Sequence, residues 1–512
     1  MRNKKQKKIN LKNRASQNVP LTQTAEGRLN EKDIAIFLIF SSITIIFSFF
    51  AYYIINHVGF SPDEGFYIMA AKEAISGKIP YRDFGYTQTP ILPYVNGFLL
   101  YIIGFGQQAQ RVINMCWGYL AIIISMIFVL RLRGLLACFI CGWVLLSSPY
   151  WVGQNYIGTY GLTNLLMTLT AIVFCSLLHY NLKVILFSIF GVLAISCRLT
   201  VAPAVIILWA FLVWEGTDQR QKLKAIITFI AVGLTILLPF FIASPDNFIF
   251  WNIGYHIICT IHRRIFYEHI LASPSIFIMI SLAVPLAFHL KKKLTSHEVA
   301  LLLAAIAGII SQMIPKASYA CYTMLFSTMG VIGGSIILSD FKWKKYIYAF
   351  LVIFPLIYLT PLNPFNYLPL PVNVFIDDNW NNTLNEAGNF LRANTHANDL
   401  LLTPFPVMAI ESDREIFHGM EMGMFTITDT MDQTRARNLN LMHYDHLIDI
   451  VRNRKAKAII IDSNQNSFYN FFVSMPHFEP VNPERINLLY YFLARNYQVV
   501  YEREPLKIIM PK

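Results

Sequence analysis

Charged residues are scarce in this chain of 512 residues, of which 14% are Asp, Glu, Lys or Arg and 55% are hydrophobic. About a quarter of a typical soluble domain is charged, so the composition excludes a soluble protein for most of the chain. Apolar runs such as residues 34–55 and 225–243 reach the roughly twenty residues that span the hydrocarbon of a bilayer. The sequence therefore predicts a mainly α-helical, polytopic membrane protein.

Cysteine is scarce as well, and none of the seven residues follows Cys321. The C-terminal part therefore has no disulfide framework, and no cysteine pair has the spacing typical of a zinc site. Cys138 and Cys141 form a C-x-x-C sequence inside an apolar run, where we expect two buried thiols. The first apolar run lacks the cleavage pattern of a signal peptide, so we expect a retained anchor.

Positive charge is concentrated near the N-terminus, where residues 1–33 carry nine Lys and Arg and three acidic residues. Such a block can bind nucleic acid, but beside a membrane-spanning helix it is typical of a disordered cytoplasmic tail. We therefore expect no nucleic-acid partner. We expect eleven membrane spans, centred near residues 45, 120, 142, 170, 190, 208, 233, 281, 306, 328 and 352.

The predicted topology follows from charge. Each even-numbered span ends near basic residues, as the positive-inside rule requires if these spans run from outside to inside. Residues 34–360 then form a transmembrane domain with an acidic outer loop at 57–110. Everything after a proline-rich junction at 361–375 is extracytoplasmic. We expect a multi-pass protein of the plasma membrane, which in a bacterium is the inner membrane.

Residues 376–512 differ in composition from the bundle. From residue 362 onward acidic residues outnumber Lys and Arg, although the whole chain has a net charge of +12. A helix is expected at 383–395, begun by a capping box of Thr383 and Glu386. The expected strands are 399–403, 458–462 and 499–502. This pattern predicts a small extracytoplasmic α/β domain.

The outer loop begins with SPDEGFYIMAAKEAISGKIPYRDFGYTQTP at residues 61–90. Ser61 and Glu64 fit the capping box of a helix that ends at Gly77. Capping and the helix dipole can account for Asp63 and Glu64, but they leave Asp83 and the nearby cations unexplained. An apolar stripe on this helix is expected to lie at the membrane surface, and it comprises Phe66, Met69, Ala70 and Ala74.

Several cations fall on the outer side of the predicted membrane. Any one of them can simply reach toward lipid head groups. Together they can form a phosphate site, because the planar arginine fork binds phosphate oxygens bidentately. The outer cations are Lys72, Lys78, Arg82, Arg111, Arg198, Arg263, Arg264 and Lys316. Our substrate-binding candidates are Arg111, Arg198, Arg263 and Arg264, with Tyr160 as an aromatic that can stack on a sugar, although interface belts also use tyrosine.

Carboxylates that face a phosphate site suit sugar transfer from a lipid phosphate. A base takes the proton of the acceptor hydroxyl, and cations stabilise the charge that grows on the departing phosphate. Our catalytic candidates are Asp63, Glu64 and Asp83. An acidic, oxygen-rich site also suits magnesium or manganese, with Asp63 as the ligand if a metal binds.

Three motifs resemble the first outer loop of the C-type glycosyltransferase superfamily, namely PDEGFY, GKIPYRDF and TPILPY. Members of that superfamily include protein O-mannosyltransferases and lipid A aminoarabinose transferases. IGTYGLTNLL, at residues 157–166, resembles the second outer loop, and the hydropathy profile is similar through about residue 360. The resemblance implies a polyprenyl-phosphate sugar donor and a loop acid that attacks or orients the acceptor.

Carried over by position, Asp63 matches the catalytic acid of the superfamily, and Glu64 matches the second acid of the mannosyltransferase pair. Arg198 lies where the superfamily uses a cation near the lipid phosphate. The chain departs from the aminoarabinose transferases at two places. A Gln-Thr pair precedes Pro90 where they have an acidic and a basic residue, and Asn164 stands where they have an acid. These departures count against a metal site of their kind and against the aminoarabinose reaction.

The sequence thus predicts a hexosyl- or pentosyltransferase that moves a sugar to a hydroxyl of an acceptor protein, lipid or glycan. A surface-polysaccharide polymerase or ligase would use the same donor and stays an alternative. A secondary transporter is less favoured, because transporters place ionisable groups near the bilayer midplane and no acid interrupts a span centre here. His256, His262 and His269 have poor spacing for one metal, so we expect interfacial packing.

Overall fold

Long apolar segments form a helical bundle, and the more polar C-terminal segment forms an α/β domain. The computed structural model describes residues 31–57, 62–148, 158–258, 274–289, 294–312, 320–341, 344–358, 380–462, 482–504 and 506–512. The chain divides into two compact units, Met1–Ser42 and Ile43–Lys512. The helices after residue 43 and the α/β domain belong to the second unit.

Each of the eleven predicted span centres lies inside a helix. Within the described residues, four helices are long and apolar enough to cross a membrane, namely α2 (Glu31–His57), α5 (Gln107–Arg133), α9 (Tyr180–Cys197) and α11 (Gln219–Ala243). The other centres fall in shorter helices, namely α6 (Leu135–Leu146), α8 (Tyr160–Cys175), α10 (Ala202–Glu215), α15 (Pro274–His289), α16 (Ser296–Ser311), α17 (Ser327–Leu338) and α18 (Lys344–Tyr358). The chain is a membrane protein.

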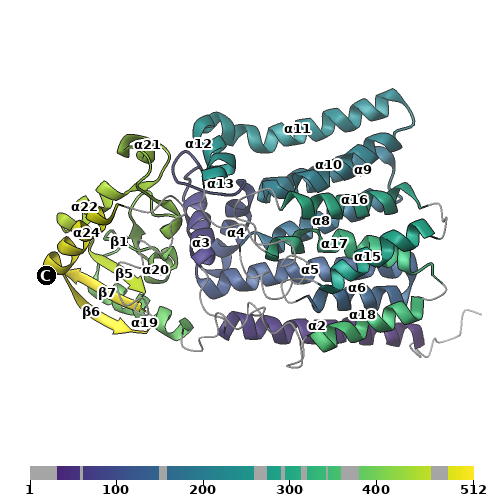
Figure 1. The fold of residues 1–512 in the computed structure, drawn as a ribbon, viewed down its shortest axis with the longest axis horizontal. Helices are drawn as coiled ribbons and strands as arrows, with labels where there is room; N and C mark the ends of the chain where they lie inside the picture. The colour runs from purple at the N-terminus through teal and green to yellow at the C-terminus, as the bar shows by residue number, and fades with distance from the viewer. Residues whose placement is uncertain are drawn as a thin grey trace, which may run out of the picture. The chain divides into compact units, whose positions relative to one another are not determined.

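The bundle is built from neighbouring helices that lie side by side (Figure 1). Helix α5 packs against α6 and α8, α8 packs against α9, and α10 packs against α16. The buried thiols of Cys138 and Cys141 lie in α6, as expected, and both are free. Helix α11 contacts α9 and α10 but leaves most of its apolar surface exposed, as suits a helix that faces lipid.

Basic and acidic residues meet at one end of the bundle. Lys183 at the start of α9 contacts Glu215 at the end of α10, with Nζ and Oε2 3.2 Å apart. His297 at the start of α16 contacts the other oxygen of Glu215 at 2.8 Å. Arg133 at the end of α5 lies 3.4 Å from Glu298 and 3.5 Å from Asp340. These contacts join the ends that the charge pattern assigns to the cytoplasm.

The acidic loop forms two helices, α3 (Pro62–Ile75) and α4 (Ile91–Ile103). The predicted membrane-surface stripe on α3 is wrong. Its members Phe66, Met69, Ala70 and Ala74 are all buried, because α3 packs on α4 and on the α/β domain. Helix α4 was not predicted, although its sequence ILPYVNGFLLYII is strongly apolar.

Short helical segments connect the bundle at the end where the acidic loop lies. After α11 the chain forms α12, the π-helical turn η2 and α13. A 3-10 turn η1 precedes α10, and another, η3, precedes α17. Their bounds are α12 (Pro245–Ile249), η2 (Phe250–Gly254), α13 (Tyr255–Ile258), η1 (Leu199–Val201) and η3 (Ala320–Phe326).

The α/β domain contains a five-stranded sheet with the strand order β2-β1-β5-β7-β6. Strand β1 pairs in parallel with β2 and β5, whereas β7 is antiparallel to β5 and β6. A second sheet pairs β3 with β4. The elements are α19 (Trp380–Asn394), β1 (Leu400–Leu402), α20 (Pro406–Ser412), β2 (Glu415–Ile416), η4 (Gly423–Thr426), β3 (Ile427–Thr428), α21 (Gln433–Asn438), β4 (Met442–His443), α22 (Tyr444–Arg452), β5 (Ala458–Asp462), α24 (Pro483–Asn496), β6 (Tyr497–Arg503) and β7 (Leu506–Pro511).

The three predicted strands and the predicted helix of this domain are present. The capping box is wrong, because α19 already includes Trp380 and Thr383 is a buried residue inside the helix. The Thr383 hydroxyl donates to the carbonyl of Glu504, and Glu386 forms an ion pair with Arg503. Met69 of α3 belongs to the same hydrophobic core as this domain. The core therefore continues from the α/β domain into the acidic loop.

Candidate active site

Asp63 lies in the first turn of α3, where backbone N–H groups favour an acidic residue. The residue as a whole is partly exposed, but its carboxylate is surrounded by protein, and no described residue donates a hydrogen bond to that carboxylate. Burial raises the pKa of Asp63 from 3.8 to about 6, the positive charge of Arg198 lowers it, and the charge of Glu64 raises it. Asp63 is therefore an ionised, weakly solvated carboxylate at neutral pH, which is the state that a proton acceptor needs.

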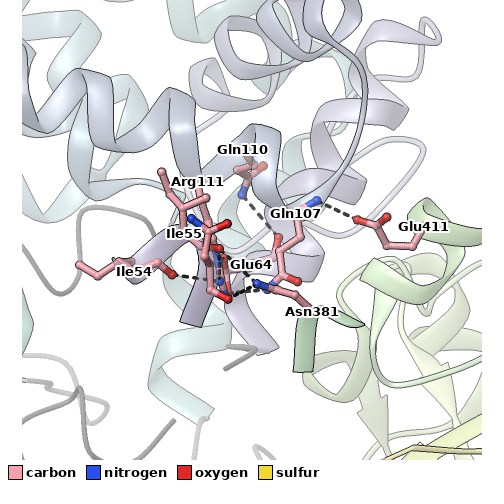
Figure 2. Close-up of polar contacts among 9 residues, drawn as sticks. Ile54, Ile55, Glu64, Gln107, Gln110, Arg111, Asn381 and Glu411 are labelled. Atoms are coloured by element: carbon pink, nitrogen blue, oxygen red, sulfur yellow. Dashed lines mark hydrogen bonds and ion pairs between the residues drawn. The ribbon is translucent and has the colours of Figure 1, made fainter. Parts of the chain in front are cut away.

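Glu64, the next residue, has a different environment. Its carboxylate is fully buried against the guanidinium of Arg111, which also has no exposed surface. Arg111 donates from Nε to Oε1 at 2.6 Å and from Nη2 to Oε2 at 2.8 Å, and the Gln107 amide donates to Oε2 at 3.1 Å. Figure 2 shows these side chains converging on Glu64. This bidentate pair joins α3 to α5, and the residues named here fill both oxygens of Glu64.

The same cluster reaches the end of α2 and the α/β domain (Figure 2). Arg111 Nη1 donates to the carbonyl oxygens of Ile54 and Ile55 at 3.2 and 3.3 Å. Asn381 of α19 donates to the Ile55 carbonyl as well. Glu411 of α20 accepts the backbone N–H of Gln107, at the start of α5, at 2.9 Å. The arginine thus satisfies carbonyl groups that the end of α2 leaves without helical partners.

Arg198 lies at the end of α9, on the same side of the bundle as the acidic loop. It is 3% exposed, and its Nη1 donates to the Thr159 hydroxyl at 2.9 Å. The guanidinium lies 5.1 Å from the ring centre of Tyr160 and 4.2 Å from that of Tyr322. Two tyrosines therefore hold the planar group by cation–π contact. The influence of Arg198 on the pKa of Asp63 places these two charges in one electrostatic environment.

Asp83 is turned toward its own loop. Its carboxylate accepts the backbone N–H of Ile79 at 2.7 Å and pairs with Arg82 at 2.7 Å. The hydrogen bond from Arg82 is the main reason that the pKa of Asp83 is lowered. Among the described contacts of Asp83 none joins it to Asp63 or to Arg198. The structure brings Asp63 and Arg198 into one environment and pairs Glu64 with Arg111, while Asp83 stabilises a turn.

Two residues near Arg198 are not among the site residues predicted from the sequence. Tyr86 is fully buried, and its hydroxyl has no hydrogen-bond partner among the described residues. His256 of α13 contacts the Thr87 carbonyl through Nε2 at 3.0 Å, and burial lowers its pKa, with a smaller contribution from the charge of Arg198. Tyr86 lies within FGYTQTP, beside the motifs quoted above, but nothing in the sequence distinguishes it from other interfacial tyrosines.

Some predicted residues lie outside the described part of the chain. These are Arg263, Arg264, Lys316, His262 and His269, and the junction at 361–375. Among the described residues no group of three or more His, Cys, Asp or Glu could hold a metal ion. Around Asp63, Glu64 is bound to Arg111 and the neighbouring charge is the cation Arg198. This set of described donors does not fit a divalent cation, which prefers several oxygen ligands.

Comparison with solved structures identifies the fold. The crystal structure of ArnT, an aminoarabinose transferase from Cupriavidus metallidurans, bound to undecaprenyl phosphate, matches with a TM-score of 0.62 over 93% of this chain and 97% of that chain. The chain has the C-type glycosyltransferase fold. The sequences are only 11% identical. The apo form of ArnT matches with the same TM-score and coverage at 12% identity.

An oligosaccharyltransferase from Archaeoglobus fulgidus, solved with a tethered acceptor peptide, is a more distant match. It matches with a TM-score of 0.49 at 12% identity, over 90% of this chain and 72% of that chain. No protein-family model and no curated protein sequence matches the chain. The fold predicted from the outer-loop motifs is confirmed.

Proposed function

We propose that the protein is a membrane glycosyltransferase that moves a sugar from a polyprenyl-phosphate-linked donor to an acceptor hydroxyl. The main support for this proposal is that the charges of Asp63 and Arg198 interact within one site. A carboxylate without a described hydrogen-bond donor lies in the field of a buried arginine that two tyrosines orient. A general base and a phosphate-binding cation are the two groups that the reaction requires.

In the proposed step the acceptor O–H proton moves to the carboxylate of Asp63 as the acceptor oxygen bonds to the anomeric carbon. The bond between that carbon and the phosphate oxygen breaks, and its electron pair stays on the departing polyprenyl phosphate. The guanidinium of Arg198 stabilises the charge that develops there. Attack opposite the leaving group inverts the anomeric configuration. The ArnT structure bound to undecaprenyl phosphate supports a lipid phosphate as the carrier.

Glu64 and Arg111 act in this proposal through position rather than by contact with substrate. Their buried pair fixes the first turn of α3 on α5, and the negative charge of Glu64 raises the pKa of Asp63. Tyr160 is buried and holds Arg198 by cation–π contact. Asp83 stabilises the turn at residues 79–83 through Ile79 and Arg82.

The orientation in the membrane is also part of the proposal. Lys183 and Arg133 gather at one end of the bundle, whereas Asp63 and Arg198 belong to the other. By the positive-inside rule, we expect the site to lie on the extracytoplasmic side of the plasma membrane. A reporter fused after residue 293 should be cytoplasmic, and one fused after residue 375 should be exported. Reporters on the same side would contradict this orientation.

The direct test of function is sugar transfer by the purified protein in lipid nanodiscs. We would offer polyprenyl-phosphate donors that carry single hexoses or pentoses, with acceptor peptides, lipids and glycans, and follow the products by mass spectrometry. Transfer from one donor class, with release of polyprenyl phosphate, is the expected result. Absence of transfer and of donor binding across the panel would refute the proposal.

A polymerase or ligase of surface polysaccharide would use the same lipid-linked donor and the same transfer step, and would differ only in its acceptor. A glycan acceptor that accumulates repeated units in this assay would select that alternative. The buried ion pairs of the described bundle lie near helix ends, as Lys183–Glu215 and Glu64–Arg111 do. This placement gives no support to a transporter, whose ionisable groups lie near the midplane.

A further inference from the structure

A turn of the α/β domain, residues 438–440, is inserted between two segments that flank the site. Its neighbours are the loop at residues 79–89 and the segment α12–η2. Asn440 donates from its amide to the Tyr81 carbonyl at 2.7 Å, and Asn247 of α12 donates to the same carbonyl at 2.9 Å. The Asn247 amide also donates to the Asn438 carbonyl at 2.8 Å. One backbone oxygen of the loop thus receives hydrogen bonds both from the turn and from α12.

The contact has the features of a built interface. Asn247 and Asn440 are buried, and Tyr81 has no exposed surface. Trp251 of η2 donates from its indole N–H to the Leu439 carbonyl at 3.0 Å. A Cβ at Gly85 would lie 2.2 Å from the same indole ring, so only glycine permits this approach. Backbone carbonyls buried in this way need donors, and the two asparagines and the tryptophan supply them.

Two residues at the contact adopt a left-handed backbone conformation. Asn440 has φ of 55°, which asparagine tolerates. Tyr81 has φ of 74°, which is unusual for a large side chain and costs free energy unless surrounding contacts hold it. Its N–H donates to the Phe84 carbonyl, and its hydroxyl donates to the Gln88 carbonyl at 2.6 Å. The loop is therefore folded around Tyr81, and the α/β domain binds the carbonyl of that residue through the Asn440 amide.

The far end of this loop touches the site. The Thr87 carbonyl contacts His256, whose pKa responds to the charge of Arg198. The Thr89 hydroxyl donates to the Ile195 carbonyl at 2.7 Å, near the end of α9, where Arg198 follows. Tyr86, with its buried hydroxyl, immediately precedes Thr87 in the chain. A shift of the loop at Tyr81 would therefore move groups that lie beside Arg198.

We propose that the turn at residues 438–440 is a positioning element for the active site, and that Asn440 and Asn247 act through the Tyr81 carbonyl to hold the loop at 79–89 beside Arg198. This inference rests on the proposed function and gives the α/β domain a specific part in it. In this proposal the α/β domain fixes the position of the loop at 79–89, which borders the donor site, and Asn440 itself does not contact the substrate.

The test compares Asn440→Gly and Asn247→Ala with a matched control, Asn496→Ala. Glycine keeps the positive φ at residue 440 and removes only the amide. Asn496 is also a buried asparagine, and its amide donates to the Val451 and Arg452 carbonyls inside the α/β domain. For each variant we would measure hydrogen exchange of the peptide that covers residues 79–89, sugar transfer, and thermal stability.

In Asn440→Gly and Asn247→Ala, we expect faster exchange at the amides of Tyr81 and Asp83, which donate within the loop. We expect a roughly 10- to 100-fold lower kcat/KM, because small displacements of reacting groups are costly. The double variant should lose little more than either single one, since both act on one carbonyl. Asn496→Ala should lower thermal stability without either effect.

Unchanged exchange in Asn440→Gly would overturn the inference, as would faster exchange with full transfer activity. Equal effects of Asn496→Ala would also overturn it, because they would assign the losses to general instability. Absence of transfer in the wild-type protein would refute the proposed function instead. The exchange comparison would then still decide whether the turn anchors the loop.

Discussion

The two ends of the helical bundle treat charge differently. At one end Glu215 contacts both Lys183 and His297, and Arg133 contacts Glu298. At the other end Asp63 receives no hydrogen bond from the described residues, and burial holds its pKa at about 6. Charges that only stabilise a fold are expected to be paired when buried. A carboxylate kept in an unfavourable environment points to chemistry at that end.

The largest expected effect comes from a substitution at the end of the bundle that contains Asp63. Asp63→Asn should lower the rate of sugar transfer by roughly 100- to 10,000-fold, because it removes the proton acceptor. Its thermal stability at neutral pH should stay equal or rise. The raised pKa means that ionised Asp63 destabilises the fold above about pH 6, and asparagine carries no charge. The matched control is Asp246→Asn, an exposed acid in the first turn of α12 that should keep normal activity.

Substitutions of Arg198 give a second test of the difference between the two ends of the bundle. Arg198→Ala should lower kcat/KM by about 100- to 1,000-fold, the range for loss of one group that stabilises a developing oxyanion. Binding of the polyprenyl-phosphate donor should weaken as well, as measured by titration in nanodiscs. Arg198→Lys keeps the charge without the fork and should retain part of the activity. Normal donor affinity in Arg198→Ala, with the exposed Arg437→Ala as control, would contradict the phosphate role.

Arg111 should behave as a structural cation. Arg111→Ala leaves Glu64 buried without its bidentate partner, and loss of one partner of a buried pair costs roughly 3 to 5 kcal/mol of stability. Thermal unfolding in detergent, with activity measured well below the midpoint, separates folding from chemistry. A stable but inactive Arg111→Ala protein would instead indicate direct contact with substrate.

The opposite end of the bundle should affect stability alone. Lys183→Ala removes a charged partner of Glu215 and should cost about 1.5 to 3 kcal/mol. Transfer activity per folded molecule should be unchanged, because this cluster lies at the other ends of α9 and α10 from Arg198. A selective loss of kcat without a loss of stability would remove the distinction between the two ends.

Much of the fold follows from the sequence, because long apolar runs can satisfy their backbone polar groups in lipid only as helices. Strands β1, β5 and β6 were likewise signalled by short apolar or β-branched segments between turn residues. Helix α4 is not among the predicted elements, because its apolar segment falls within the predicted outer loop at 57–110. The stripe on α3 was assigned to lipid because hydropathy cannot distinguish a membrane surface from the core of a neighbouring domain.

The site was only partly predictable. Asp63 and Glu64 are adjacent in the sequence, so the sequence alone predicts similar surroundings for both. Only the tertiary contacts show that Glu64 forms a buried ion pair and that Asp63 is a weakly solvated acid. Arg198 was selected from its position in an outer connection, but Tyr322, which lies over its guanidinium, belongs to a segment far away in the chain. Pairings of this kind depend on how helices pack, and helical periodicity does not encode them.

The most direct test of the central claim is the pH dependence of kcat/KM, which reports the pKa of the essential base in the free enzyme. Activity should fall as the pH drops through about 6, because Asp63 must be ionised to accept the proton. In Glu64→Gln this fall should move to lower pH, since the charge of Glu64 raises the pKa of Asp63. A fall near 3.8, the ordinary value for aspartate, or a profile that Glu64→Gln leaves unchanged would contradict the assignment of Asp63 as the base.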